Sequence, residues 1–159
     1  MIDLTSVDRD FKLWVLLHQT RDAVHKAAEK ELRQFGLSPM EASLLFAVHA
    51  IGERATPAEI SRWLFRESHS VSGLLDRMEK KGLVKRSKDL ERRNLVRISL
   101  TDKSRQFYNT YAEMKVIDRI LSSLTEDDRR KLAEYLTRLR DRAIEDLGIE
   151  RELPFPGPV

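Results

Sequence analysis

The residues best suited to chemistry in this sequence are basic and small polar side chains gathered in the middle of the chain. From Glu53 to Arg105 we count fourteen Lys and Arg against eight Asp and Glu, a local net charge of +6 in a chain whose total is +3. A basic excess confined to one block is typical of a surface that binds a polyanion, usually a nucleic acid. An ordinary solvated charged surface is the alternative that charge alone leaves open.

Motifs that would indicate an enzyme or a metal site are absent from the sequence. It has no glycine-rich phosphate loop and no nucleophile elbow, and its four His residues never come at the spacing of metal ligands. Because the sequence contains no Cys, a disulfide framework, a cysteine zinc site and thiol redox sensing are excluded. We therefore expect a binding protein with no catalytic residue, no metal and no cofactor.

Length and composition fit one compact helical protein. The chain has 159 residues, of which 41% are hydrophobic and 35% are charged. Its longest apolar run, Leu13 to Leu17, is far shorter than the roughly 20 residues that cross a bilayer. The start of the sequence has no basic region typical of a signal peptide. We expect a cytoplasmic protein that does not contact membranes.

Two capping boxes predict where the helices ahead of the basic residues begin. The tetrapeptides Ser38-Pro39-Met40-Glu41 and Thr56-Pro57-Ala58-Glu59 both combine an N-cap residue, Pro in the first turn and Glu three residues later. The first of these helices should end near Ile51 and Gly52. A third helix is predicted from Ser68 as N-cap to Gly82, with an apolar stripe at helical spacing formed by Val71, Leu74, Leu75 and Met78.

The segment after Gly82 is predicted to form a β-hairpin with a charged tip. Residues 83–87 and 95–100 are short, partly β-branched runs, and the polar connector 88–94 separates them. Helix, short helix, polar-faced helix and hairpin follow one another in the order of a winged helix-turn-helix. In that fold the second helix of the pair enters the major groove of DNA.

Helical patterns before and after this unit predict a dimer. One helix should run from about Ser6 to Phe35, one from Thr101 to Leu121 and one from Thr125 to Gly148. The run Leu13 to Leu17 is apolar on all sides, so we expect it between its own core and a second subunit. The last helix also carries a long apolar stripe, formed by Leu132, Leu136, Leu139 and Ala143.

We therefore expect a mainly α fold with a small β-hairpin wing. A helical dimerisation region should comprise residues 1–36 and 102–148, and a winged helix-turn-helix DNA-binding domain residues 37–101. Residues 149–159 include three Pro and one Gly, and we expect them to form an extended or disordered tail.

The central sequence resembles the signature of the MarR family of transcriptional regulators. The resemblance is carried by the run from Val71 to Arg86, by Glu91-Arg92-Arg93 and by Leu100-Thr101. It departs from the usual pattern in having Glu91 in place of Asp, one position early, and Gly73 where a polar or basic side chain is frequent. The resemblance implies a homodimer on double-stranded DNA, with the recognition helices in successive major grooves of a pseudo-palindromic operator. Repression is the expected action.

The resemblance also implies the DNA-binding residues. The wing arginines suit a narrow minor groove, although Asp89 or Glu91 could satisfy them within the wing instead. Arg77 could contact DNA or pair with neighbours on its own helix. The predicted set from helix and wing is Ser68, Ser70, Ser72, Gly73, Arg77, Lys80, Arg86, Arg92 and Arg93.

The family's response to small aromatic ligands implies an effector cleft between the dimerisation and DNA-binding regions. Six aromatic and His side chains could line it, and the alternative for each is an ordinary place in the core. These six are Trp14, His18, Phe46, His49, Phe107 and Tyr111. A winged helix can also serve as an architectural DNA binder or as a protein-interaction module, which are the alternative functions.

Overall fold

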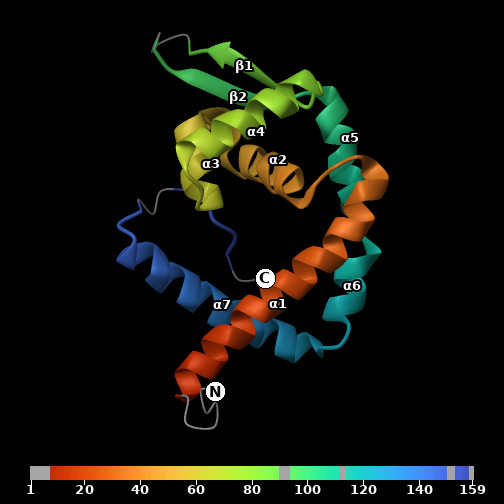
Figure 1. The fold of residues 1–159 in the computed structure, drawn as a ribbon, viewed down its shortest axis with the longest axis vertical. Coiled ribbons are helices and arrows are strands. Elements are labelled where there is room, and N and C mark those ends of the chain that lie inside the picture. Colours follow the sequence, from red (N-terminus) through yellow and green to blue (C-terminus); the bar gives the residue numbers. More distant parts are fainter. Residues whose placement is uncertain (1–7, 90–93, 112–113, 150–152, 158–159) are drawn as a thin grey trace, which may run out of the picture.

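Seven helices and one β-hairpin form the described part of the chain (Figure 1). The computed structural model describes residues 8–89, 94–111, 114–149 and 153–157. Short 3₁₀ turns follow the first and second helices. The elements are α1 (Arg9–Leu32), α2 (Pro39–Ile51), α3 (Pro57–Leu64), α4 (Ser68–Lys80), β1 (Val84–Lys88), β2 (Val96–Leu100), α5 (Asp102–Tyr111), α6 (Lys115–Leu121) and α7 (Glu126–Asp146). The predicted fold class, mainly helical with a small hairpin, is confirmed.

The predicted helix starts at Ser38 and Thr56 are confirmed. Ser38 Oγ accepts a hydrogen bond from the backbone N–H of Glu41 at 3.3 Å, and Glu41 accepts one from the backbone N–H of Ser38 at 2.9 Å. At α3, Thr56 Oγ1 accepts from the N–H of Glu59 at 3.2 Å, but the Glu59 carboxylate accepts from the Thr56 hydroxyl. Both starts are therefore capped by the residues that the sequence indicates.

Two predicted boundaries were wrong. Ser68 is the first residue of α4, and the N-cap is Glu67, which makes no capping hydrogen bond with its side chain. The predicted single helix from Thr101 to Leu121 is divided into α5 and α6, because Met114 has an extended conformation. The N–H groups of Lys115 and Val116 donate to Glu31 of α1 at 3.0 and 2.9 Å. A carboxylate from another helix thus caps α6, which local sequence does not reveal.

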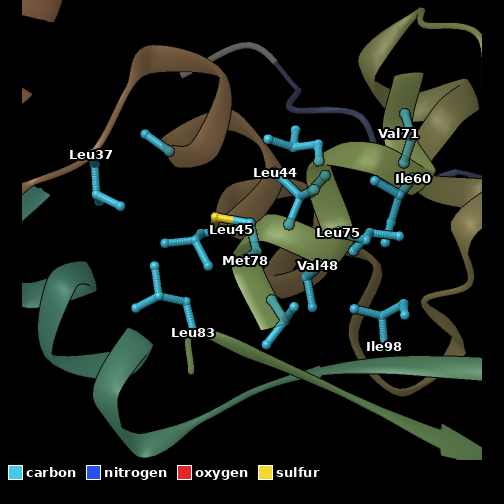
Figure 2. Packing of buried hydrophobic residues seen from close by; sticks show 14 of the residues in the cluster. Leu37, Leu44, Leu45, Val48, Ile60, Val71, Leu75, Met78, Leu83 and Ile98 are labelled. Carbon is cyan, nitrogen blue, oxygen red and sulfur yellow. The ribbon is translucent and has the colours of Figure 1, made fainter. Parts of the chain in front are cut away.

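The core lies where α2, α3 and α4 pack on the hairpin (Figure 2). The predicted stripe of α4 is buried in full. Leu44 of α2, Ile60 of α3 and Ile98 of β2 have almost no exposed surface. The antiparallel hairpin pairs Val84 with Leu100, and the N–H of Ile98 donates to Ala55 O at 2.9 Å. The hairpin is therefore fixed to the turn that precedes α3.

The N-terminal half of α1 and most of α7 lie away from this core (Figure 1). Leu13 is 60% exposed and Leu139 is 54% exposed. The run Leu13 to Leu17 is not buried in its own chain, so the prediction that it packs on its own core was wrong. Among the described residues no single helix is long and apolar enough to span a membrane, and only α1 and α2 taken together, bent by 85°, have the length and composition.

Candidate DNA-binding surface

One face of α4 is turned toward solvent along the whole helix. Val71, Leu74, Leu75 and Met78 are buried, and they hold the opposite face against the core. Of the predicted contact residues on α4, only Gly73 is half-buried, whereas the others are exposed. The exposed ones are Ser68, Ser70, Ser72, Arg77 and Lys80. The structure therefore brings the predicted helix residues together on one accessible surface.

His69 belongs to this surface and was missed by the sequence analysis. It is exposed in the first turn of α4. Helical spacing places it in line with Ser72 and Gly73, and N-terminal residues of a recognition helix commonly contact base edges. Its position in the first turn of α4 could have identified His69 from the sequence.

The hydroxyl of Ser72 donates a hydrogen bond to Ser68 O at 3.0 Å. The Ser72 oxygen therefore remains an acceptor for a base or phosphate partner.

The guanidinium of Arg77 lies over Gly73 and makes no ion pair or hydrogen bond within the described residues. A Cβ built on Gly73 would be 3.9 Å from Arg77 Nη1, which is ordinary van der Waals contact. Gly73 is therefore not required by space or by backbone conformation at this point. The alternative that Arg77 pairs with an acidic neighbour on its own helix is not seen among the described residues, so its charge stays available to a partner.

Arg86 has partners that the sequence analysis did not expect. Its guanidinium lies 2.6 Å from Asp76 Oδ1 and 2.6 Å from Glu79 Oε2, and its backbone N–H donates to Glu79 Oε1 at 3.2 Å. Burial alone would lower the pKa of Arg86, but hydrogen bonds to Asp76 and Glu79 raise it above its ordinary value. Arg86 therefore neutralises two acidic residues of α4 and holds strand β1 against that helix.

A second arginine fixes the base of the wing. Arg97 Nε lies 2.6 Å from Asp89 Oδ2, across the hairpin, and Arg97 Nη1 donates to Arg54 O at 2.9 Å. The predicted wing residues Arg92 and Arg93 lie outside the described residues. Asp89, one of the acids proposed as their alternative partners, already binds Arg97. Arg97 therefore joins the two ends of the hairpin strands to the turn before α3.

Lys81, the residue after the last one of α4, forms an ion pair with Glu41 of α2. Lys81 Nζ lies 2.7 Å from Glu41 Oε1, and the Glu41 side chain is only 8% exposed. Burial would raise the pKa of Glu41, but hydrogen bonds from Lys81 and from the Ser38 backbone outweigh it and lower the pKa below its ordinary value. The same Glu41 carboxylate caps its own helix. It therefore joins the start of α2 to the end of α4.

The structure does not bring the predicted effector residues into one cleft of a single chain. The rings of Trp14 and His18 lie side by side on α1, with centroids 4.3 Å apart and 51° between their planes, and both are exposed. Trp14 precedes Leu32, the end of α1, by about 27 Å along the helix. Phe46 and Phe107 are half-buried, His49 is exposed, and the Tyr111 side chain lies outside what the structure describes.

The cavities of the structure give no support to an effector site at the six predicted aromatic and His residues. The five described cavities are lined by other side chains. Within the described ranges, no group of three or more His, Asp or Glu side chains could hold a metal ion. The surface of α4 and the wing is therefore the candidate site of this chain.

A helix pair α3–α4, with a polar and basic face on α4 and a hairpin behind it, defines a winged helix-turn-helix. Residues 35–93 match the model of the MarR family. The winged helix-turn-helix of this chain is therefore similar to that of the MarR family of transcriptional regulators. A comparison with curated protein sequences gave no match.

Solved structures of this class cover nearly the whole chain. The organohalide-sensing regulator RdhR-CbdbA1625, bound to 2,4-dichlorophenol, is 29% identical, with a TM-score of 0.78 over 91% of this chain and 86% of that one. Its ligand-free form is 26% identical, with a TM-score of 0.80 over 99% and 92% of the two chains. A cysteine-to-serine mutant of MarR from E. coli, complexed with operator DNA, is 18% identical, with a TM-score of 0.76 over 87% and 99%, and shows the fold alone.

Proposed function

We propose that this protein is a sequence-specific DNA-binding regulator that acts as a homodimer on a pseudo-palindromic operator. The observation that carries the proposal is the amphipathic α4, whose apolar stripe is buried while its small polar and basic side chains are exposed. A helix held in this way can enter a major groove without exposing apolar surface. The excess of basic residues around it favours a DNA backbone as partner.

The exposed apolar surface on α1 and α7 supports the homodimer. Leu13 lines one hollow with Tyr135 and Leu139, and Leu17 lines another with Leu136. Apolar surface of this extent, on two helices outside the core, is typical of a subunit interface. We assign dimerisation to residues 1–36 and 102–148, and DNA binding to residues 37–101. Two-fold symmetry would then present two copies of α4 to two half-sites.

Roles within the DNA-binding surface follow from the contacts of each residue. We propose that Ser68, Ser70, Ser72 and the additional His69 approach base edges, because they lie on the exposed N-terminal half of α4. Arg77, with Gly73 beneath it and Lys80 one turn on, would contact bases or phosphates. Arg92 and Arg93 would reach the minor groove from the wing tip. Arg86 would act through Asp76 and Glu79, by fixing the wing on α4.

We further propose that the protein represses transcription in the cytoplasm and is released by a small aromatic ligand. The relative that binds 2,4-dichlorophenol supports this ligand class. Because Trp14 and His18 are exposed in one chain, a cleft that uses them would need the second subunit. Chlorinated phenols are therefore the first compounds to try.

A gel shift tests the proposed function. The full chain is mixed with DNA from upstream of its own gene, with and without an excess of unrelated duplex. A sequence-specific regulator should keep its complex in the presence of this competitor. Loss of the complex to the competitor would indicate an architectural DNA binder, and no complex at all would indicate a protein-interaction module. Either result would contradict the proposal.

A further inference from the structure

The C-terminal segment 153–157 connects the DNA-binding unit to the last helix. In Figure 1 this dark blue segment runs between α3 and α7. Leu153 is 8% exposed and belongs to the same buried cluster as the core of the winged helix. We call residues 153–157 the strap. The strap makes specific side-chain contacts with the elements on both sides of it.

Phe155 is the centre of the strap. Its ring lies 5.5 Å from that of Phe65, with 11° between the planes, and 6.2 Å from that of Trp63, with 18° between the planes. The guanidinium of Arg140 lies over the Phe155 ring at 5.7 Å from its centroid. Stacked aromatic rings and a cation over a ring are attractive geometries. Phe155 is thus held by α3 and its following turn on one side and by α7 on the other.

On the α7 side, the strap has both a polar and an apolar contact. Arg140 Nη1 donates a hydrogen bond to Pro156 O. Ile144 is the only buried residue of α7, a helix that the structure describes throughout, and it lines a cavity with Leu153 and Phe155. The strap therefore lies against the one buried residue of α7.

On the other side, the strap contacts the turn that leads into the recognition helix. Trp63 Nε1 donates to Pro154 O at 3.4 Å. Phe65 ends α3 in a left-handed conformation, with φ of 52°, and α4 begins three residues later. The turn is itself fixed, because the Ser61 hydroxyl donates to Arg66 O. Phe155 therefore contacts the turn from which α4 starts.

We infer that Phe155 is a positioning residue for operator recognition: by stacking on Trp63 and Phe65 and packing under Arg140, it fixes α4 relative to the dimerisation helix α7. This inference rests on the proposed function, since it needs a dimer that binds two half-sites. In such a dimer, the distance between the two α4 helices sets the half-site spacing that binds best. Within the described residues, the strap contacts α3 and its following turn on one side and α7 on the other.

The physical consequence is preorganisation. If the strap is loosened, each DNA-binding unit samples more orientations, and the fraction of dimers with the correct spacing falls. Affinity for the best-spaced operator should fall, whereas affinity for badly spaced operators should fall less or rise. Binding to one isolated half-site should not change, because α4 and its buried stripe do not depend on Phe155.

The test compares Phe155→Ala with Phe155→Tyr and Gly157→Ala in the full chain. Phe155→Tyr keeps the ring, and Gly157→Ala changes the same segment at a point where a Cβ would contact nothing. The probes are the inverted-repeat DNA that the wild type selects from a random library, the same half-sites moved apart or together in steps of one base pair, and a single half-site. Dissociation constants are measured for every pair of variant and duplex.

We expect Phe155→Ala to bind the best-spaced duplex about tenfold more weakly and to discriminate against wrong spacing about tenfold less than the wild type. Its affinity for the single half-site should equal that of the wild type. Phe155→Tyr and Gly157→Ala should behave like the wild type on every duplex. An unchanged spacing preference in Phe155→Ala would overturn the inference, and so would an equal loss of affinity on all duplexes, which indicates only damage to the fold.

A second measurement needs no DNA. With 5-fluorotryptophan in both Trp positions, ¹⁹F NMR gives separate signals for Trp14 and Trp63, and Phe155→Ala should shift only the Trp63 signal because the stacked ring is removed. An unmoved Trp63 signal would overturn the contact itself. If the wild type selects no DNA, the proposed function fails and the positioning role is overturned with it, while the Trp63 signal still decides whether the contact forms.

Discussion

The Arg86 guanidinium on β1 lies 2.6 Å from a carboxylate oxygen of Glu79 on α4, and the other oxygen of the same carboxylate accepts the backbone N–H of Arg86. Two hydrogen bonds between the same two residues fix both the distance and the direction of the strand relative to the helix. Strand β1 is therefore held against α4. This relationship gives Arg86 a structural role beside the DNA contact that its charge and position in the sequence predicted.

Arg86→Ala should lower the free energy of unfolding by about 1–3 kcal/mol, because it leaves Asp76 and Glu79 without their cation. DNA affinity should fall as well, since two carboxylates on α4 then repel phosphates. Adding Glu79→Gln to Arg86→Ala should recover part of that affinity. Urea unfolding and binding isotherms give both quantities. If Arg86→Ala keeps its stability but loses affinity and one unit of salt dependence, Arg86 contacts DNA directly.

The wing should add affinity without selecting the sequence. Changing Arg92 and Arg93 together to Ala should weaken operator binding by about 1–3 kcal/mol and flatten its dependence on salt, because fewer counterions are released. The preferred sequence should survive. The matched control is the double change of Arg129 and Arg130 to Ala, which removes the same charge from α7. Isotherms at several salt concentrations decide the matter. Full affinity with an unchanged salt slope would mean that the wing arginines do not meet DNA.

The dimer should depend on the exposed leucines of α7. Leu139→Glu places a carboxylate in the proposed interface, where an unpaired charge costs about 3 kcal/mol or more and weakens the dimer more than a hundredfold. The single chain should still fold, because Leu139 is 54% exposed. Val96→Glu makes the same change on the wing and should leave the mass unchanged. Sedimentation at micromolar concentration measures the mass. A wild-type monomer, or a Leu139→Glu protein that remains dimeric, would refute the assigned interface.

The link between α2 and α4 through Glu41 should depend on pH. Because the pKa of Glu41 is lowered in the folded chain, its carboxylate stabilises the fold at pH values above its ordinary pKa of 4.5, and this contribution is lost as the pH falls through the lower folded value. Glu41→Gln should therefore be less stable than the wild type by about 1–2 kcal/mol at neutral pH, with a difference that shrinks in acid. Denaturation at a series of pH values measures it. A difference that stays constant with pH would show that ionisation of Glu41 has no part.

Local signals predicted most of the winged helix. The capping residues at Ser38 and Thr56 and the apolar stripe of α4 act within a few residues of one another, so the sequence displays them directly. The hairpin was also predicted, because short, partly β-branched runs and a polar connector are local features. The exposed face of α4 followed from the same periodicity. Family resemblance added the assignment of roles.

Long-range contacts could not be predicted in this way. Glu31 caps α6 from a distance of more than eighty residues along the chain, and this contact accompanies the break in a helix that the apolar pattern showed as continuous. Arg86 was expected on DNA because its carboxylate partners on α4 cannot be identified before the hairpin is placed. Phe155 lies in a proline-rich tail, where composition indicates only the absence of a helix. The position of α1 is also a long-range feature, and it places the predicted effector residues Trp14 and His18 away from the core.

Footprinting on the selected DNA tests most directly whether two copies of α4 read one operator. Hydroxyl-radical cleavage reports backbone protection, and methylation of guanine N7 reports the major groove. We predict two protected major-groove segments that are related by two-fold symmetry. Their centres should lie one helical turn, about 10 base pairs, or a multiple of it apart. Two protein chains should be bound per duplex. A single protected segment with one chain per duplex, or protection that does not depend on sequence, would contradict the account.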